Sequence, residues 1–230
     1  MTTVQLNHVL TTLALHQLRD GTGTDRPLLL LHGLGEHTPA VPPPYVEPWT
    51  GPIWGLDFTG HGQSSVPSGG GYTAEVLMAD VDHALAHLGE ATVFGRGLGA
   101  YIALLISGAR PELVAGAILT DGPGLAGGGP SPHSPVAVRP VGPRATDTPD
   151  GFALVEMARD IRPGDYATQY VRQAVQLSGL DDPISLVGVV RPPWMAAAAD
   201  EPGVATTTLD EALARYATAH RQPVTPTPPT

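Results

Sequence analysis

The chain has 230 residues, 42% of them hydrophobic, and a formal net charge of −10 from 22 acidic and 12 basic residues. This length suffices for one buried core and is short for two, while the absence of cysteine excludes disulfides, thiolate metal sites and a cysteine nucleophile. No lysine and arginine cluster, signal peptide or membrane-spanning run is visible, so we expect a cytoplasmic protein that neither binds nucleic acid nor crosses a membrane.

The first half of the chain alternates short apolar runs with helical patterns. Residues 4–18 alternate loosely and end at Asp20-Gly21, which predicts an antiparallel strand or hairpin at a sheet edge. The elements expected after Pro27 are strands at 28–31 and 52–58, a helix at 72–88, a strand at 91–94, a helix at 98–109 and a strand at 114–120. This order is typical of a doubly wound, mostly parallel α/β sheet.

The second half is rich in proline and glycine and its pattern is less regular. The elements expected there are a loop at 122–151, helices at 152–159 and 166–177, a strand at 194–199, a helix at 209–220 and a Pro/Thr-rich tail at 222–230. We predict one domain over residues 1–221, in which residues 122–190 form a lid.

Two glycine-rich turns follow the first two parallel strands. Residues 30–35 read Leu-Leu-His-Gly-Leu-Gly. Within them, His32, Gly33 and Leu34 are candidates for an oxyanion site and its pocket, because a backbone amide on such a turn can approach a substrate oxygen closely. Residues 57–64 read Asp-Phe-Thr-Gly-His-Gly-Gln-Ser, in which the central histidine is either a turn residue or a base.

A third glycine-rich turn, residues 94–100, joins a strand to a helix and reads Phe-Gly-Arg-Gly-Leu-Gly-Ala. Its central residue, Gly97, has no side chain, and neither Arg96 nor Leu98 offers a nucleophile. The same turn also satisfies the dinucleotide fingerprint Gly-x-Gly-x-x-Ala, with Asp121 about twenty residues further on. Two parallel strands precede it, however, whereas the fingerprint normally opens the first βαβ unit.

Together, these turns over residues 27–121 resemble the α/β-hydrolase superfamily, whose members carry an oxyanion loop, a structural turn and a nucleophile elbow, Gly-x-nucleophile-x-Gly, in this order. The stretch from His32 to the second turn is similar to the monoacylglycerol-lipase branch, and residues 99–102 are similar to the non-catalytic N-myc downstream-regulated proteins. The resemblance implies an α/β-hydrolase fold and hydrolysis of esters or other small molecules without a cofactor or metal. It also implies that Leu34 and Leu98 are the oxyanion donors.

Because Gly97 replaces the nucleophile, the resemblance leaves two functions open, a hydrolase and a non-catalytic protein that binds a small-molecule ligand. Nucleotide binding is a third interpretation, and the oligomeric state is left open. Asp200 follows the expected strand at 194–199, where the family often carries its acid, but a solvated loop aspartate is the alternative. His220 is the candidate base or a helix-end residue. Asp121 is an alternative acid or a turn cap.

We further predict that Leu34, Gly97 and Asp121 converge at the carboxyl ends of the strands. The amides of Leu34 and Leu98 would then remain free to bind a small anion, with Arg96 adding charge if it turns inward. Replacement of Gly97 by serine should be tolerated by the fold, at a cost of roughly 1–3 kcal/mol if the backbone is strained.

Overall fold

The computed structural model describes residues 2–8, 11–21, 26–125, 148–158 and 162–223. Its strands form one eight-stranded sheet in the order β1-β2-β4-β3-β5-β6-β7-β8. The β1/β2 and β2/β4 pairs are antiparallel, and the other neighbouring pairs are parallel. The strands are β1 (Thr2–His8), β2 (Thr11–Arg19), β3 (Leu28–Leu31), β4 (Ile53–Asp57), β5 (Ala91–Arg96), β6 (Val114–Thr120), β7 (Ile184–Leu186) and β8 (Val204–Thr206).

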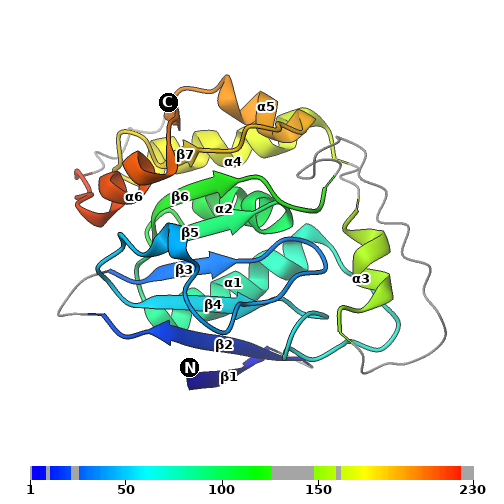
Figure 1. The fold of residues 1–230 in the computed structure, drawn as a ribbon. Helices are drawn as coiled ribbons and strands as arrows, with labels where there is room; N and C mark the ends of the chain where they lie inside the picture. The colour runs from blue at the N-terminus through cyan, green and yellow to red at the C-terminus, as the bar shows by residue number, and fades with distance from the viewer. Residues whose placement is uncertain (1, 9–10, 22–25, 126–147, 159–161, 224–230) are drawn as a thin grey trace.

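The helices connect these strands and cover the sheet unequally. They are α1 (Ala74–Leu88), α2 (Leu98–Ala109), α3 (Gly151–Glu156), α4 (Gly164–Leu177), α5 (Pro193–Ala199), α6 (Leu209–Ala217) and a 3₁₀ turn, η1 (Pro44–Val46). Helices α1 and α2 lie on one side of the sheet and α6 lies on the other (Figure 1). The predicted edge hairpin, and the predicted order of strands and helices from β3 to β6, are confirmed.

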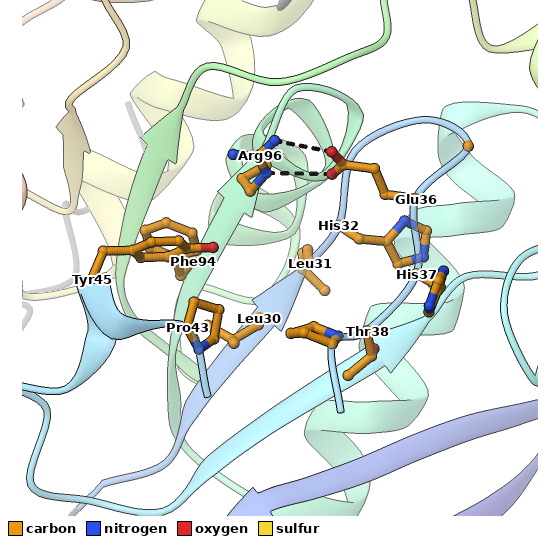
Figure 2. Close-up of a pocket in the computed structure, with 12 residues that line it drawn as sticks. Leu30, Leu31, His32, Glu36, His37, Thr38, Pro43, Tyr45, Phe94 and Arg96 are labelled. Carbon is orange, nitrogen blue, oxygen red and sulfur yellow. Dashed lines mark hydrogen bonds and ion pairs between the residues drawn. The ribbon is translucent and has the colours of Figure 1, made fainter. Parts of the chain in front are cut away.

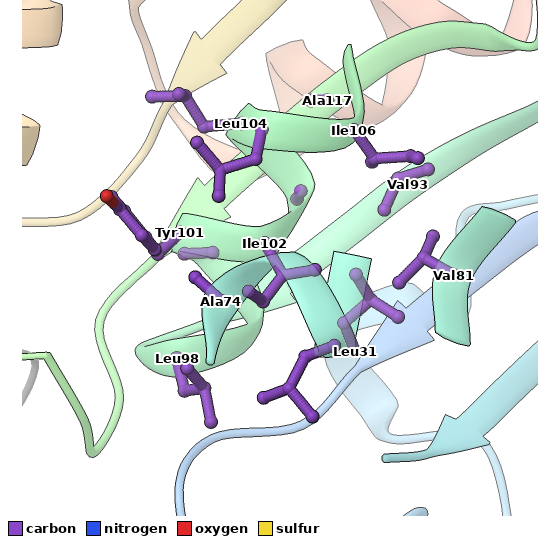
Figure 3. Packing of buried hydrophobic residues seen from close by; sticks show 14 of the residues in the cluster. Leu31, Ala74, Val81, Val93, Leu98, Tyr101, Ile102, Leu104, Ile106 and Ala117 are labelled. Carbon is purple, nitrogen blue, oxygen red and sulfur yellow. The ribbon is translucent and has the colours of Figure 1, made fainter. Parts of the chain in front are cut away.

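Alternation of side chains along the parallel strands divides the core into two clusters. Leu29 and Leu31 of β3 face α1 and α2, whereas Leu28 and Leu30 face the opposite side. Figure 3 shows the first cluster, in which Ile102 of α2 packs among residues of β3, β5 and α1. Burial of one such leucine or isoleucine side chain contributes about 1.5–3 kcal/mol, so this large cluster is the main source of the sheet's stability.

The opposite side of the sheet has a thinner cover. Val46 and Trp49, from the connection between β3 and β4, complete a smaller cluster with residues of α6. Among residues 32–52, the only regular element is η1. Because this connection contains no helix longer than η1, a loop covers the sheet surface near the carboxyl ends of β3 and β5.

Helix α1 begins two residues later than predicted and ends at Leu88, as predicted. The Thr73 hydroxyl accepts a hydrogen bond from the Val76 amide at 3.3 Å, and Gly89, with φ of +78°, terminates the helix.

Within the described residues, no helix is long and apolar enough to span a membrane.

Two predictions for the second half of the chain are wrong. Residues 194–199, expected as a strand, belong to α5, because Pro193 suits the first turn of a helix and the following alanines favour helix. The region 122–190, expected as a lid, includes core elements: α4 packs against α2, and β7 pairs with β6. Residues 126–147 of that region, and 224–230 of the expected tail, lie outside the described residues.

Candidate functional site

The turn between β5 and α2 has the geometry of a nucleophile elbow. Gly97 adopts φ of +50° and ψ of −111°, a conformation that side-chain-bearing residues rarely adopt. The amide of Leu98 begins the helix, and the amide of Leu34 reaches the same place from the loop after β3. The two amides therefore converge on one place.

The oxygen between these two donors belongs to the chain itself. The carbonyl of Pro123 accepts the Leu34 amide at 2.8 Å and the Leu98 amide at 3.0 Å. One backbone oxygen thus provides the partner that an unpaired amide at a helix N-terminus requires. The prediction that both amides remain free for a small anion is wrong, because the segment after β6 folds back onto them.

The same segment fills the space where a nucleophile would stand. A Cβ atom on Gly97 would lie 2.3 Å from the Pro123 oxygen and 2.4 Å from the Gly122 carbonyl carbon. Both distances are well inside van der Waals contact and involve backbone atoms. A serine at position 97 therefore requires the backbone of residues 122–123 to move, so its cost should exceed that of backbone strain alone.

A separate cavity of about 490 Å³ opens beside the elbow, on the side of the sheet that faces away from α2. Leu30 and Phe94 form its floor, and Pro43 and Tyr45 cover it from the connection between β3 and β4. The Tyr45 ring stacks on the Phe94 ring at 5.5 Å between centroids, with an interplanar angle of 27° (Figure 2). The volume of this cavity lies within the range typical of small-molecule sites.

The polar wall of this cavity is an ion pair. Glu36 binds Arg96 through two hydrogen bonds, from Nη2 at 3.0 Å and from Nε at 3.3 Å (Figure 2). The Gly33 amide also donates to Glu36, at 2.9 Å. Burial alone would raise the pKa of the Glu36 carboxyl, but these bonds outweigh it and the pKa is lowered. Glu36 therefore stays ionised and neutralises Arg96 beside the cavity.

No protein-family model and no curated protein sequence matches the chain. Two solved structures match most of it. The crystal structure of a membrane phospholipase A, described as a bacterial virulence factor, has a TM-score of 0.53 and 17% identity over 90% of this chain and 78% of that chain. A hypothetical protein from Pseudomonas aeruginosa PAO1 has a TM-score of 0.54 and 20% identity over 81% of each chain.

Other hydrolase structures match a smaller region. A putative α/β hydrolase from Nostoc sp. PCC 7120 has a TM-score of 0.43 and 24% identity, over 52% of this chain and 42% of that chain. Across four such structures, this chain covers between 39% and 49% of their length. Likeness at these identities informs about fold only.

The sheet order decides the fold, because antiparallel β2 precedes parallel strands in the order β4-β3-β5-β6 and a sharp elbow joins β5 to α2. The chain has the α/β-hydrolase fold. This confirms the predicted fold.

Within this α/β-hydrolase fold, the two candidates for the remaining triad do not meet at the elbow. Asp200 is exposed at the C-terminal end of α5. His220 is exposed beyond α6, whose end is bound by Arg26 through the carbonyls of Tyr216 and Ala219. Arg26 precedes β3, so His220 lies near the amino ends of the parallel strands, whereas the elbow lies at their carboxyl ends. A role for His220 as the base at Gly97 is excluded by this placement.

Asp121 holds a loop. Its carboxylate accepts the Val189 amide at 2.8 Å and the Val190 amide at 3.0 Å, which ties the end of β6 to the segment after β7. Both carboxylate oxygens are therefore in use, which fits the turn-cap alternative. The dinucleotide interpretation loses support as well, because its acidic residue is engaged and the Leu98 amide at the helix N-terminus is bound to Pro123.

The two serines nearest to a nucleophile context are also engaged. The Ser64 hydroxyl donates to the Asp57 carbonyl at 2.5 Å and accepts the Ala14 amide at 2.9 Å. The Ser65 hydroxyl accepts the Thr12 amide at 2.8 Å. Both side chains thus fasten the turn after β4 to β2.

Two buried histidines shape the loop that carries Leu34. His32 donates from Nδ1 to the Gly33 carbonyl at 2.8 Å, and its Nε2 accepts the Phe58 amide at 3.1 Å. His61 accepts the Gly35 amide at 3.2 Å. Burial lowers the pKa of His32, and burial together with the neighbouring His32 lowers the pKa of His61 to about 3. Both rings are neutral and hold the loop through hydrogen bonds. For His61, this fits the turn-residue alternative.

Sequence reasoning missed three features of this region: the Pro123 carbonyl, the ion pair of Glu36 with Arg96, and the stack of Tyr45 on Phe94. A partial signal existed for the ion pair, since Glu36 follows the first glycine-rich turn and Arg96 lies inside the third. No local pattern indicates which backbone carbonyl reaches the oxyanion donors.

Proposed function

We propose that this protein is a non-catalytic member of the α/β-hydrolase fold that binds a small molecule in the cavity beside β3 and β5. The observation that carries the proposal is the Pro123 carbonyl, which accepts both the Leu34 and the Leu98 amides. A hydrolase of this fold needs these donors at the oxygen of a tetrahedral intermediate. Here the amides already hold a permanent protein oxygen.

Two further observations support the loss of serine-type catalysis. Gly97 offers no oxygen to attack a carbonyl, and its surroundings leave no room for one. A serine would also need a base within hydrogen-bond reach, and the candidate base, His220, lies at the other edge of the sheet.

The cavity supports retention of a binding function. It is about 490 Å³ in volume, it is lined mainly by apolar and aromatic side chains, and a few polar groups stand at one wall. Pockets of this kind are the usual form of small-molecule sites. It lies on the opposite side of the sheet from α2, so a ligand can enter it without displacing Pro123 from the two amides.

The test combines an activity measurement with a binding measurement. We expect no labelling by a fluorophosphonate probe and no release of product from short aryl esters above the rate in buffer. We also expect small aromatic molecules to raise the melting temperature. Tyr45→Ala should weaken this shift, whereas Val41→Ala should preserve it, because Val41 lies in the same loop but is 68% exposed and outside the cavity. A burst of product equal to the protein concentration would contradict the proposal.

A further inference from the structure

The geometry points to an uncharged, planar aromatic molecule carrying a hydroxyl group, such as a phenol or naphthol, as the class of ligand that the cavity takes. This inference rests on the proposed function and makes it more specific. It follows from the balance of charge at the polar wall and from the flat surfaces that face the cavity.

The charge balance excludes an ionic ligand. Both oxygens of Glu36 are engaged, Oε1 by Arg96 Nη2 and Oε2 by Arg96 Nε and the Gly33 amide. The guanidinium is therefore already neutralised, and a carboxylate that enters the cavity would lose its hydration and gain only the Nη1 donor of a cation that is paired with Glu36. The field of Asp121, which acts on Arg96, further disfavours an anion.

A cationic ligand would have to share an acceptor that the protein already uses. Oε1 of Glu36 accepts from Arg96, Oε2 accepts two hydrogen bonds, and each oxygen of Asp121 binds a backbone amide. A neutral ligand incurs neither penalty.

The shape of the lining favours an aromatic body. Tyr45 is 40% exposed, although one face of its ring is stacked on Phe94, so part of the phenol remains uncovered at the cavity. The ring of Pro43 and the planar guanidinium of Arg96 provide further flat surfaces (Figure 2). Aromatic rings stack favourably on phenol and guanidinium planes.

One hydrogen bond would orient such a ligand. The Nη1 group of Arg96 makes no hydrogen bond to any residue that the structure describes, while Nε and Nη2 are used by Glu36. A ligand hydroxyl oxygen can accept from this nitrogen and leave the ion pair intact. Aliphatic hydrocarbons have no such acceptor, which separates them from a phenol or naphthol.

The experiment compares three probes with one ring system and different charges, 1-naphthol, 1-naphthoate and 1-naphthylmethylammonium, by calorimetric titration of the full chain at pH 7.5. For the wild type, we expect naphthol to bind at least tenfold more tightly than either ion. Glu36→Gln keeps an acceptor for the Gly33 amide but removes the charge that neutralises Arg96. We expect this variant to shift the ratio at least tenfold toward naphthoate.

Arg96→Met provides a second, opposite change if the first variant does not fold. It leaves Glu36 unpaired, so the ratio should shift toward the ammonium probe, while Val41→Ala should keep the wild-type order. Equal or tighter binding of naphthoate by the wild type, or unchanged ratios in both charge variants, would overturn the inference. Ion-preferring binding without hydrolysis of 1-naphthyl acetate overturns the ligand class alone. Hydrolysis of that ester overturns the proposed function, and binding of none of the probes to any variant overturns both.

Discussion

Gly97 has a left-handed backbone and a filled space where a side chain would lie. The first property is shared by many turn glycines, but the second depends on Gly122 and Pro123, which come 25 or more residues later in the sequence. The sequence predicted the sharp turn between β5 and α2 and the convergence of Leu34 with Leu98. It could not predict which carbonyl accepts these two amides, because a contact between two backbone segments has no signature in side-chain pattern.

The first residue-level prediction concerns Gly97→Ser. We expect the free energy of unfolding to fall by about 2–6 kcal/mol, because strain of about 1–3 kcal/mol adds to overpacking of similar size. We also expect no gain of ester hydrolysis. Gly89→Ser is the matched control, since Gly89 also has positive φ but no atom lies within 4 Å of the place that a Cβ would take there. Its loss in urea denaturation should be smaller, about 1 kcal/mol, and equal losses in both variants would argue against the overlap at Pro123.

The second concerns His61. Its pKa of about 3 in the folded protein lies below the ordinary value of 6.5, so the unfolded chain takes up the proton first as the pH falls. The contribution of neutral His61 to the free energy of unfolding is therefore fully present above pH 6.5 and decreases progressively toward pH 3. At pH 5 this residue alone should remove about 2 kcal/mol, at about 1.4 kcal/mol per pH unit. His61→Gln should flatten the slope of stability between pH 6.5 and 5 in urea titrations, and an unchanged slope would refute this assignment.

At the level of elements, the sequence predicted the regular strands and helices well where one periodicity dominated. Strands β3 to β6 are short apolar runs between turn residues, and α1 carries both a polar N-cap and a terminating glycine. Residues 194–199 of helix α5 were predicted as a strand because a short apolar segment fits either a buried strand or a short helix. Pro193 at its start was the local signal for a helix.

Helix α6 provides the prediction at this scale. The Thr208 hydroxyl accepts the Glu211 amide, and Glu211 accepts the Thr208 amide at 3.0 Å, forming a capping box. Thr208→Ala should lower the free energy of unfolding by about 1 kcal/mol in urea denaturation. Thr218→Ala, at the exposed C-terminal end of the same helix, should cost less than about 0.5 kcal/mol. If both variants lose equal stability, the capping box is not what stabilises α6.

On the scale of the whole molecule, the sheet separates two sites that a hydrolase would join. The Pro123 carbonyl accepts hydrogen bonds from the Leu34 and Leu98 amides. The cavity, in contrast, is open, because the connection between β3 and β4 forms no helix longer than η1. The cavity could not be predicted from the sequence, because it results from the loop path of residues 32–52 relative to Leu30 and Phe94. The overall α/β architecture could be predicted, because strands, glycine-rich turns and helices follow one another along the chain in an order typical of a parallel α/β sheet.

Amide hydrogen exchange followed by NMR measures directly whether the Pro123 carbonyl stays bound to the Leu34 and Leu98 amides. We expect both amides to exchange as slowly as the Thr92 amide, which binds the Pro27 carbonyl at 2.9 Å within the sheet. We also expect added acetate or phosphate to leave both resonances unmoved. Fast exchange of the two amides, with saturable shifts upon addition of a small anion, would show instead that the two amides are free to bind a ligand.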